Sequence, residues 1–461
     1  MRKSIIKKMI KLKSRILLTG FAIFLLGFSA SISLVYETAI PGGGHGTMDS
    51  VAIWVAENPQ ESLLFITDKT YGYLEMHNPV TNQYIGRIGG NGSSEGKLGY
   101  PNGVGVAYNV ATGKGMNDVV FAVERDNNRV SMFSLPEKEF IGSFGGNRLD
   151  EPYGIGFYKT NGVLQAWITN TGDNPNTVAI YNITATNNGA TGDFVREFNT
   201  LGELESIVID PVYQEVYLSD ESEERNIMVY GLNGNFKKRI GHGLFVEDPE
   251  GIALYDIGSG NGWLVVSDQN SDPTQFEIFE RGSLKHLGYF IGETDGTDGL
   301  TLTQYALPNF PDGSFYAVHS DKRVHAYDWK DIAAGLNLDV RVLDRASTSV
   351  QDFESGDGAV PEELTLSSVM PNPYSMTGMM NNGAVHFELG LLQPESVTIQ
   401  IYNILGQTIR QITYNEQIAA GKHQYSWDVR NTLGEIVPVG IYIVAVRTNN
   451  FNKMTKMSII R

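Results

Sequence analysis

Polar residues that could bind a cation recur at one position of a repeated sequence pattern. Glu250 is the clearest case, because it stands in the turn of "DPEGIALY", directly before a small residue and a short apolar run. Glu is disfavoured in strands, and a turn does not require it. The same position is filled, at intervals of 45 to 52 residues, by Ser50, Asn102, Tyr153, Glu205 and Asp298. Asp49 stands beside Ser50 and adds a further carboxylate to this set.

A second group of charged residues follows the next apolar run of several repeats. It contains Asp68, Glu124, Asp220, Glu221 and Asp268, together with the amide of Gln269. Lys69 and Arg125 are the cations in this group. Cations placed among carboxylates suit an anionic ligand such as phosphate, bridged by metal. Ordinary salt bridges to the neighbouring acids are the alternative interpretation.

Short strand-like runs in each repeat must position these residues. In the fifth repeat they include "GIALY", "GWLVVSD" and "FEIFER". Four short strands repeated every 40 to 50 residues or so are typical of the blades of a β-propeller. The repeats therefore predict an all-β fold with a six-bladed β-propeller over residues 48–335. A β-sandwich with fortuitous spacing is the alternative.

A propeller would bring the six repeated positions together. The innermost strand of each blade runs along a central channel, so the turns that enter these strands converge on one mouth of it. Carboxylates in one ring raise one another's pKa unless a cation neutralises them. Oxygen donors from carboxylates and amides suit Ca²⁺ better than Zn²⁺. The pattern therefore predicts a calcium site, with a solvated acidic rim as the alternative.

The same stretches resemble the calcium-dependent β-propeller phytases. The similarity spans about residues 48–335 and is most specific in "AIWV" and "TDK" of the first repeat and in the fifth repeat. It implies that the calcium ligands are Asp49, Glu205, Glu250 and Asp298, with Asp220 and Glu221 nearby. It also implies catalytic roles for Lys69, Arg125 and Tyr153, and substrate binding by these three residues and Gln269. In that family a water activated by calcium attacks phosphorus, so the resemblance predicts a phosphomonoester hydrolase.

Two departures from the family pattern concern the site. The family opens with two adjacent Asp residues, whereas this chain has Asp49 followed by Ser50. The third repeat lacks the usual Lys–Glu pair, because "ITNTGDNPN" supplies no cation there. The second and third repeats also resemble NHL repeats, so a binding propeller without turnover is one alternative function. A metal-dependent lactonase, which would also use a ring of carboxylates and amides, is the other.

The C-terminal part of the chain has a different composition. A polar stretch with Gly and Pro predicts a linker at residues 336–366, and the short strands of residues 367–461 predict an immunoglobulin-like β-sandwich. "PNPYS", "IYNILGQTI" and the terminal "KMTKMSIIR" resemble the type A C-terminal sorting domain of type IX secretion. That resemblance implies contact with the type IX secretion machinery and export through the outer membrane of a Gram-negative bacterium, to the cell surface or the medium. A plain adhesive or spacer sandwich is the alternative.

The N-terminal residues have the pattern of a targeting segment. Seven basic residues precede an apolar run from Ile16 to Ala30, and small residues at Ser29, Ala30 and Ser31 offer a cleavage point. The run is shorter than the roughly 20 residues of a spanning helix, so residues 1–31 predict a cleaved signal peptide rather than a membrane anchor. The formal net charge of −17 argues against nucleic acid and anionic membrane surfaces as partners. The chain has no Cys, so an exported form depends on its core and on bound metal rather than on disulfides.

Overall fold

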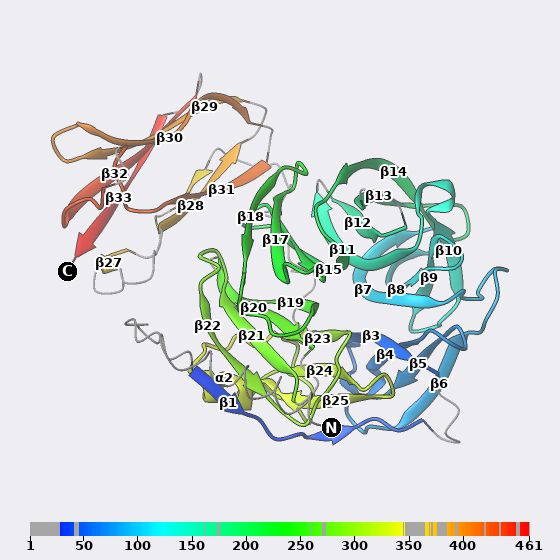
Figure 1. The fold of residues 1–461 in the computed structure, drawn as a ribbon. Helices are drawn as coiled ribbons and strands as arrows, with labels where there is room; N and C mark the ends of the chain where they lie inside the picture. Colours follow the sequence, from blue (N-terminus) through cyan, green and yellow to red (C-terminus); the bar gives the residue numbers. More distant parts are fainter. Residues whose placement is uncertain are drawn as a thin grey trace, which may run out of the picture.

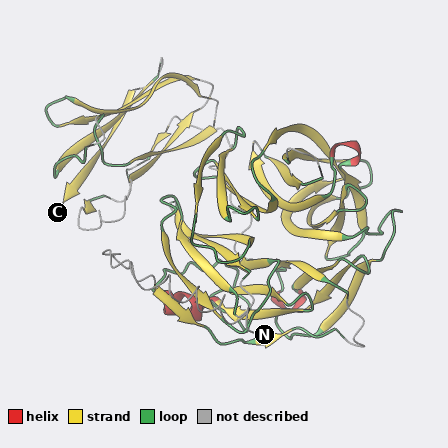
Figure 2. Ribbon diagram, viewed as in Figure 1, coloured by secondary structure: helices red, strands yellow, loops and turns green. Residues whose placement is uncertain are grey.

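The computed structural model describes residues 28–460 apart from 41–45, 161, 173–175, 259, 270–272, 344, 346–364, 368, 370–371, 376–384, 392–394, 419–420, 433–434 and 449–451. Strands make up most of the described residues, and Figure 2 shows few helical ribbons among them. The prediction of an all-β fold is therefore confirmed. The predicted signal peptide up to residue 27 and most of the predicted linker lie outside the described residues.

Residues 48–240 form four antiparallel sheets of four strands each, in chain order. The first sheet contains β3 (Met48–Trp54), β4 (Leu63–Asp68), β5 (Tyr73–His77) and β6 (Tyr84–Gly89). The second contains β7 (Pro101–Thr112), β8 (Gly115–Glu124), β9 (Arg129–Leu135) and β10 (Phe140–Phe144). The third contains β11 (Pro152–Thr160), β12 (Val163–Asn170), β13 (Thr177–Ala185) and β14 (Ala190–Asn199). The fourth contains β15 (Leu204–Asp210), β16 (Glu215–Asp220), β17 (Asn226–Gly231) and β18 (Phe236–Ile240).

Two further sheets each take their outer strand from the N-terminal segment. The fifth contains β19 (Pro249–Gly258), β20 (Asn261–Asp268), β21 (Gln275–Glu280) and β22 (His286–Ile291), with β1 (Phe28–Ser31) paired parallel to β22. The sixth contains β23 (Leu300–Thr303), β24 (Ser314–His319) and β25 (Arg323–Asp328), with β2 (Tyr36–Glu37) antiparallel to β25. The end of the predicted signal peptide is thus a paired strand in this structure.

The first strands of the six sheets contact one another in a closed circuit. β3 contacts β7, β7 contacts β11, and the series continues through β15, β19 and β23 back to β3. Figure 1 shows the sheets following one another around a common centre, as a propeller requires. Apolar side chains fill the space between neighbouring sheets, for example Trp167 and Ile180 of the third sheet against Leu218 of the fourth. Because both faces of a sheet are covered, whole strands such as β4 are buried rather than alternately exposed.

The C-terminal residues form two small sheets around their own apolar core. One contains β26 (Thr365–Leu366), β28 (Val385–Leu391) and β31 (Gly421–Trp427). The other contains β27 (Tyr374–Ser375), β33 (Asn452–Ile460), β32 (Gly440–Arg447), β29 (Glu395–Asn403) and β30 (Thr408–Ile418). Two sheets packed face to face are consistent with the predicted immunoglobulin-like domain.

One α-helix, α2 (Trp329–Leu336), follows the sixth sheet in the described part of the chain. The residues after it, at the start of the predicted linker, are held by the fifth sheet. Trp263 donates a hydrogen bond to the carbonyl of Asp339 (3.1 Å), and Tyr255 donates one to the carbonyl of Arg341 (3.0 Å). Among the described residues, no helix has the length and apolar character needed to cross a membrane.

Candidate metal and phosphate site

The repeated positions coincide with a break in the pairing of the first strands. In β3, β7, β11, β15 and β19 the register with the second strand shifts near the start of the first strand, between Pro249 and Ile252 in the case of β19. A bulge at such a place turns side chains away from the ladder and re-aims them. Glu250 lies within this break, and Asp49, Asn102, Tyr153 and Glu205 lie within the corresponding breaks.

A hydroxyl group of the second strand braces most of these breaks. The bulge releases a backbone N–H from the ladder, and a buried N–H needs another acceptor. In β19 the N–H of Gly251 donates to the hydroxyl of Ser267 (2.9 Å). Thr67, Thr169 and Ser219 accept the equivalent hydrogen bond in the first, third and fourth sheets. The recurring Ser or Thr, one residue before the end of the second strand, is therefore part of the machinery that positions the site.

Three glutamates converge on one point at this end of the strands. Carboxylate oxygens of Glu205, Glu221 and Glu250 all lie within 4.8 Å of one another. Glu205 and Glu250 are buried, at 8% and 6% exposure. Burial raises the pKa of both well above the ordinary range, and repulsion from neighbouring carboxylates adds to the effect. Negative charge on these carboxylates is therefore unfavourable unless a cation lies beside them.

Asp49 lies beside a lysine and a tyrosine. It forms an ion pair with Lys69 and accepts a hydrogen bond from the phenol of Tyr153 (2.8 Å). The ammonium of Lys69 also donates to the Tyr153 phenol oxygen (3.3 Å). Burial alone would lower the pKa of Lys69, but attraction to Asp49, Asp298 and Glu205 outweighs burial and raises it. Lys69 is therefore a positive charge held among carboxylates.

Asp298 and Gln269 form a neighbouring pair. Gln269 donates a hydrogen bond from its side-chain amide to Asp298 (2.6 Å). Burial, with repulsion from Asp49 and Asp321, raises the pKa of Asp298 to about 7. The carboxyl group of Asp298 thus also lies where negative charge is disfavoured.

A groove opens beside the glutamate cluster. It has a volume of about 780 Å³, and its lining includes Arg125, Glu151, Tyr153, Glu205 and Glu221. Arg125 is paired with Glu151 at 3.0 Å, and both side chains are well exposed. An exposed pair of this kind is weak, so the guanidinium can exchange Glu151 for an anion. The groove therefore joins a cation and a tyrosine to two of the clustered carboxylates.

The donor set fits a hard divalent cation. The side-chain oxygen and nitrogen of Asn102, which is fully buried, have no hydrogen-bond partner, and neither does Oε1 of Glu221. Buried polar atoms without partners are rare in folded proteins and mark a missing ligand or water. Carboxylate and amide oxygens are the ligands that Ca²⁺ takes. Glu205, Glu221 and Glu250 could hold such an ion. Asp49, Asp298 and the amide oxygen of Asn102 are oxygen donors at the other repeated positions.

The structure separates the predicted residues into two groups. The first comprises three contact groups: Asp49, Lys69 and Tyr153; Glu205, Glu221 and Glu250; and Gln269 with Asp298. Their charges act on one another, and Arg125 lines the groove together with Tyr153, Glu205 and Glu221. Asp220, also predicted as a metal ligand, instead accepts hydrogen bonds from the N–H groups of Glu203 (3.0 Å) and Ser222 (3.1 Å). Asp68 and Asp268 bind loop N–H groups in the same way. These acids hold the loops at the site rather than facing the cluster.

Two residues of the site did not enter the predicted ligand set. Asn102 was recognised as one of the repeated positions, but an amide gives a weaker signal for metal than a carboxylate does. Glu151, the partner of Arg125, lies two residues before Tyr153, and Glu203 and Asp248 stand at the same distance before Glu205 and Glu250. Its proximity to Arg125 depends on the packing of the second sheet against the third.

Comparison with known proteins supports the resemblance of the repeats to phytases. The family model for phytase matches residues 28–325, and the model for the FlgD Ig-like domain matches residues 377–451. A 3-phytase of Bacillus subtilis (strain 168) is 26% identical over 305 residues, which are 61% of this chain and 76% of that relative. Two solved structures have lower similarity, at 14% identity each. Hydrazine synthase of Kuenenia stuttgartiensis has a TM-score of 0.41 over 65% of this chain and 82% of that one. PorZ of Porphyromonas gingivalis has a TM-score of 0.36 over 89% and 51%.

Proposed function

Because the chain belongs to the phytase family, we propose that it is a calcium-dependent phosphomonoester hydrolase acting on phytate or a related phosphate ester. The observation that carries this proposal is the buried cluster of Glu205, Glu221 and Glu250 with Lys69 close by. Carboxylates in such a place require positive charge, and a phosphate ester brought to bound calcium requires a cation beside it. The 3-phytase relative supports the substrate class at family level only.

Separate groups of residues bind the metal and the phosphate. Asp49, Glu205, Glu221, Glu250 and Asp298 would hold calcium, with the Asn102 amide. Bound calcium supplies charge neutralisation and an activated water for attack on phosphorus.

Phosphate binding falls to the groove side of the site. Lys69, kept protonated by its acidic neighbours, and Arg125, released from Glu151, donate hydrogen bonds to the oxygens of the substrate phosphate. Burial and nearby carboxylates raise the pKa of Tyr153, so its phenol keeps the proton with which it orients Asp49. Gln269 orients Asp298 in the same manner.

The architecture and destination of the chain complete the proposal. The six sheets form a six-bladed β-propeller, supported by the closed circuit of contacts between their first strands. The C-terminal domain acts as a sorting domain for type IX secretion, and the protein is exported through the outer membrane of a Gram-negative bacterium. The sequence patterns at both ends of the chain support this export.

Release of inorganic phosphate from phytate, measured with increasing calcium and then with excess chelator, tests the activity. We expect turnover to rise with calcium and to stop in chelator. Lys69→Ala should lower kcat/KM by about 100-fold or more, because it removes a charged donor from the reacting phosphate. Lys330→Ala, at an exposed lysine of α2, is the matched control. Equal turnover with and without calcium would refute the proposal. Phosphate binding without release would favour the binding propeller.

A further inference from the structure

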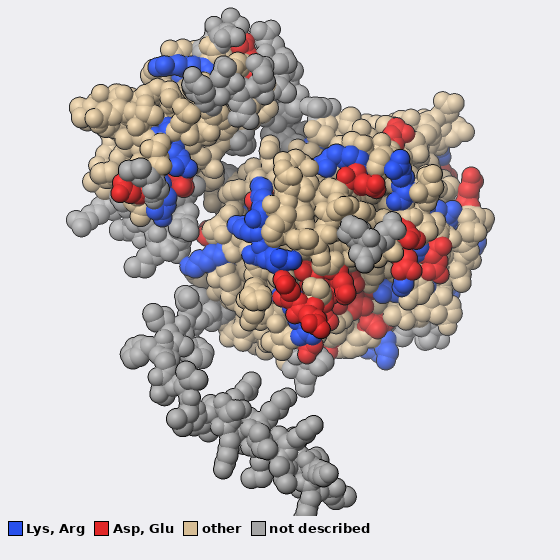
Figure 3. All heavy atoms as spheres, turned by 45° about the horizontal axis from the view of Figure 1, so that its top comes forward, with Lys and Arg blue, Asp and Glu red and all other residues tan. Residues whose placement is uncertain are grey.

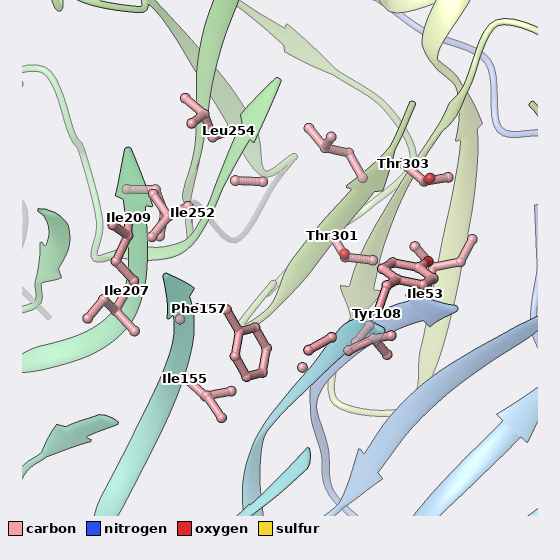
Figure 4. Close-up of a pocket in the computed structure, with 18 of the residues that line it drawn as sticks. Ile53, Tyr108, Ile155, Phe157, Ile207, Ile209, Ile252, Leu254, Thr301 and Thr303 are labelled. Atoms are coloured by element: carbon pink, nitrogen blue, oxygen red, sulfur yellow. The ribbon is translucent and has the colours of Figure 1, made fainter. Parts of the chain in front are cut away.

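The space between the first strands holds a cavity apart from the acidic site. Its volume is about 380 Å³, and each first strand contributes apolar side chains to its lining, among them Ile53, Val104, Ile155, Ile207, Ile252 and Leu300. Figure 4 shows Ile207, Ile252 and Phe157, from three strands, around a common space. None of the clustered carboxylates lines it. Each of these six residues nevertheless lies only a few positions beyond one of the repeated positions, as Ile252 follows Glu250.

Several polar groups at the cavity are already hydrogen-bonded. Gln304 donates from its amide to the carbonyls of Asp256 (2.7 Å) and Arg341 (2.9 Å), and its side-chain oxygen accepts from the N–H of Asp256 (2.9 Å). The hydroxyl of Tyr108 accepts from the N–H of Val55 (3.0 Å). The hydroxyl of Thr303 accepts from the N–H of Tyr305 (3.1 Å). Water inside a cavity needs two to four polar partners, and these groups offer it few.

The segment after α2 contributes to the wall of this cavity. Leu343 lines it, and the backbone of Leu343 is fixed by hydrogen bonds with Gln304 and Ala306 (2.8 and 3.0 Å). Arg345, two residues further, pairs with Asp118 at 2.8 Å and stacks over the ring of Tyr108 at 4.3 Å. The wall is therefore built from the six sheets together with the start of the predicted linker.

We propose that this cavity is a second binding site, for one small, uncharged and largely apolar molecule the size of an aromatic ring or a short acyl chain. The volume lies within the range of small-molecule sites, roughly 300–1,000 Å³. It is well above the roughly 150 Å³ of an engineered apolar cavity that stays dry and takes up benzene. Most of the lining residues are apolar, with Lys159 and Thr301 among the polar ones, and no carboxylate lines the cavity to hold a cation. This site does not depend on the proposed hydrolase activity.

Toluene is a suitable probe, and thermal unfolding of the full chain is the readout. A ligand that binds the folded state raises the melting temperature, saturably and by about 2 °C or more once its concentration exceeds Kd several-fold. Ala253 lines the cavity from β19 and is partly exposed there. Ala253→Phe should fill the space and abolish the rise. Ala334→Phe, the same change at an exposed position of α2, should keep it.

The outcomes separate binding from a solvent effect. A saturable rise in the wild type and in Ala334→Phe that is lost in Ala253→Phe supports the site. No rise in the wild type, or an equal rise in all three proteins, overturns it. If Ala253→Phe does not unfold cooperatively, Ala253→Leu takes its place with the same criteria.

Discussion

At the scale of single residues, Glu250 belongs to a set of largely buried carboxylates whose negative charges repel one another. Lys69 lies near these carboxylates, but it forms its ion pair with Asp49 rather than with a glutamate. The glutamates therefore remain uncompensated in the metal-free chain. Figure 3 shows that Asp and Glu side chains also gather in one patch on the face it displays. Repulsion between these carboxylates should therefore lower the stability of the folded chain without metal, and a bound cation should restore it.

Glu250→Gln tests this conflict of charges. It removes one negative charge from the cluster while keeping the shape of the side chain. We expect the calcium-free variant to melt at the same temperature as the calcium-free wild type or higher, and the rise on adding calcium to shrink by at least half. Differential scanning calorimetry with and without calcium measures both effects. Glu224→Gln, at an exposed ion pair, is the control. A variant that melts lower without calcium and keeps the full calcium response would refute the assignment.

Asp298 contributes to the pH dependence of the calcium-free chain. Its pKa of about 7 in the folded chain is above the ordinary 3.8, so the folded state binds more protons than the unfolded state between these values. The carboxyl therefore favours folding at low pH, and this advantage is lost as the pH rises from about 4 to about 7. Melting temperatures in chelator should fall across this window, and less steeply in Asp298→Asn. Asp331→Asn, on α2, should follow the wild type; a wild-type profile that Asp298→Asn leaves unchanged would contradict the assignment.

At the scale of elements, the decisive feature is the bulge at the entry of the first strands. In an unbroken ladder, the backbone of Glu250 would pair regularly with β20. The bulge frees this stretch, and the hydroxyl of Ser267 replaces the lost acceptor. The same combination recurs with Thr67, Thr169 and Ser219, so one local device positions side chains as different as Asp49, Tyr153 and Glu205.

Ser267→Ala should damage the site through this device. The buried N–H of Gly251 would lose its acceptor, which costs about 1–3 kcal/mol of the free energy of unfolding. Phosphate release should fall as well, because Glu250 is no longer held in place. Urea unfolding and the phosphate assay measure the two effects. Ser143→Ala, on the outer strand β10, serves as the control. A variant with unchanged stability and unchanged rate would show that the hydroxyl does not brace the bulge.

Much of this element-scale organisation was accessible from the sequence. The recurrence of a polar residue before an apolar run located five of these positions without any structure, although it placed them in turns before the strands rather than in bulges within them. The roles of Asp68, Asp220 and Asp268 were not accessible in this way. An acidic residue at the end of a strand has the same sequence signature whether it faces an ion or accepts hydrogen bonds from a loop. Only the position of the loop N–H groups distinguishes the two.

At the scale of the whole molecule, the N-terminal segment joins the two last sheets. β1 adds to the fifth sheet, β2 adds to the sixth, and Ile32 between them is buried at 6% exposure. Glu37 contacts Arg323 and His325 of β25. The segment therefore connects the beginning of the chain to sheets formed more than 250 residues later. A cut after residue 31, the predicted end of the signal peptide, would remove the whole of β1.

Deletion of residues 2–38 should therefore destabilise the chain relative to deletion of residues 2–27. The longer deletion removes two paired strands and the buried Ile32, with an expected loss of about 2 kcal/mol or more. Chemical denaturation of the two proteins, side by side, measures the difference. Equal denaturation midpoints would show that β1 and β2 do not contribute to the stability of the folded chain. Mass spectrometry of exported protein would show independently whether Phe28 is retained.

The sequence by itself determined the all-β class, the six-fold recurrence and the identity of most acidic residues at the site, because strand periodicity and turn chemistry are local. It also determined membership of the phytase family through contiguous stretches. The tertiary structure alone decided that Glu221 joins Glu205 and Glu250 while Asp220, one residue earlier, turns to a loop. It also decided that Leu343 closes onto the central cavity. These choices depend on which side of a strand end faces a neighbouring sheet, and that is fixed by contacts between residues far apart in the chain.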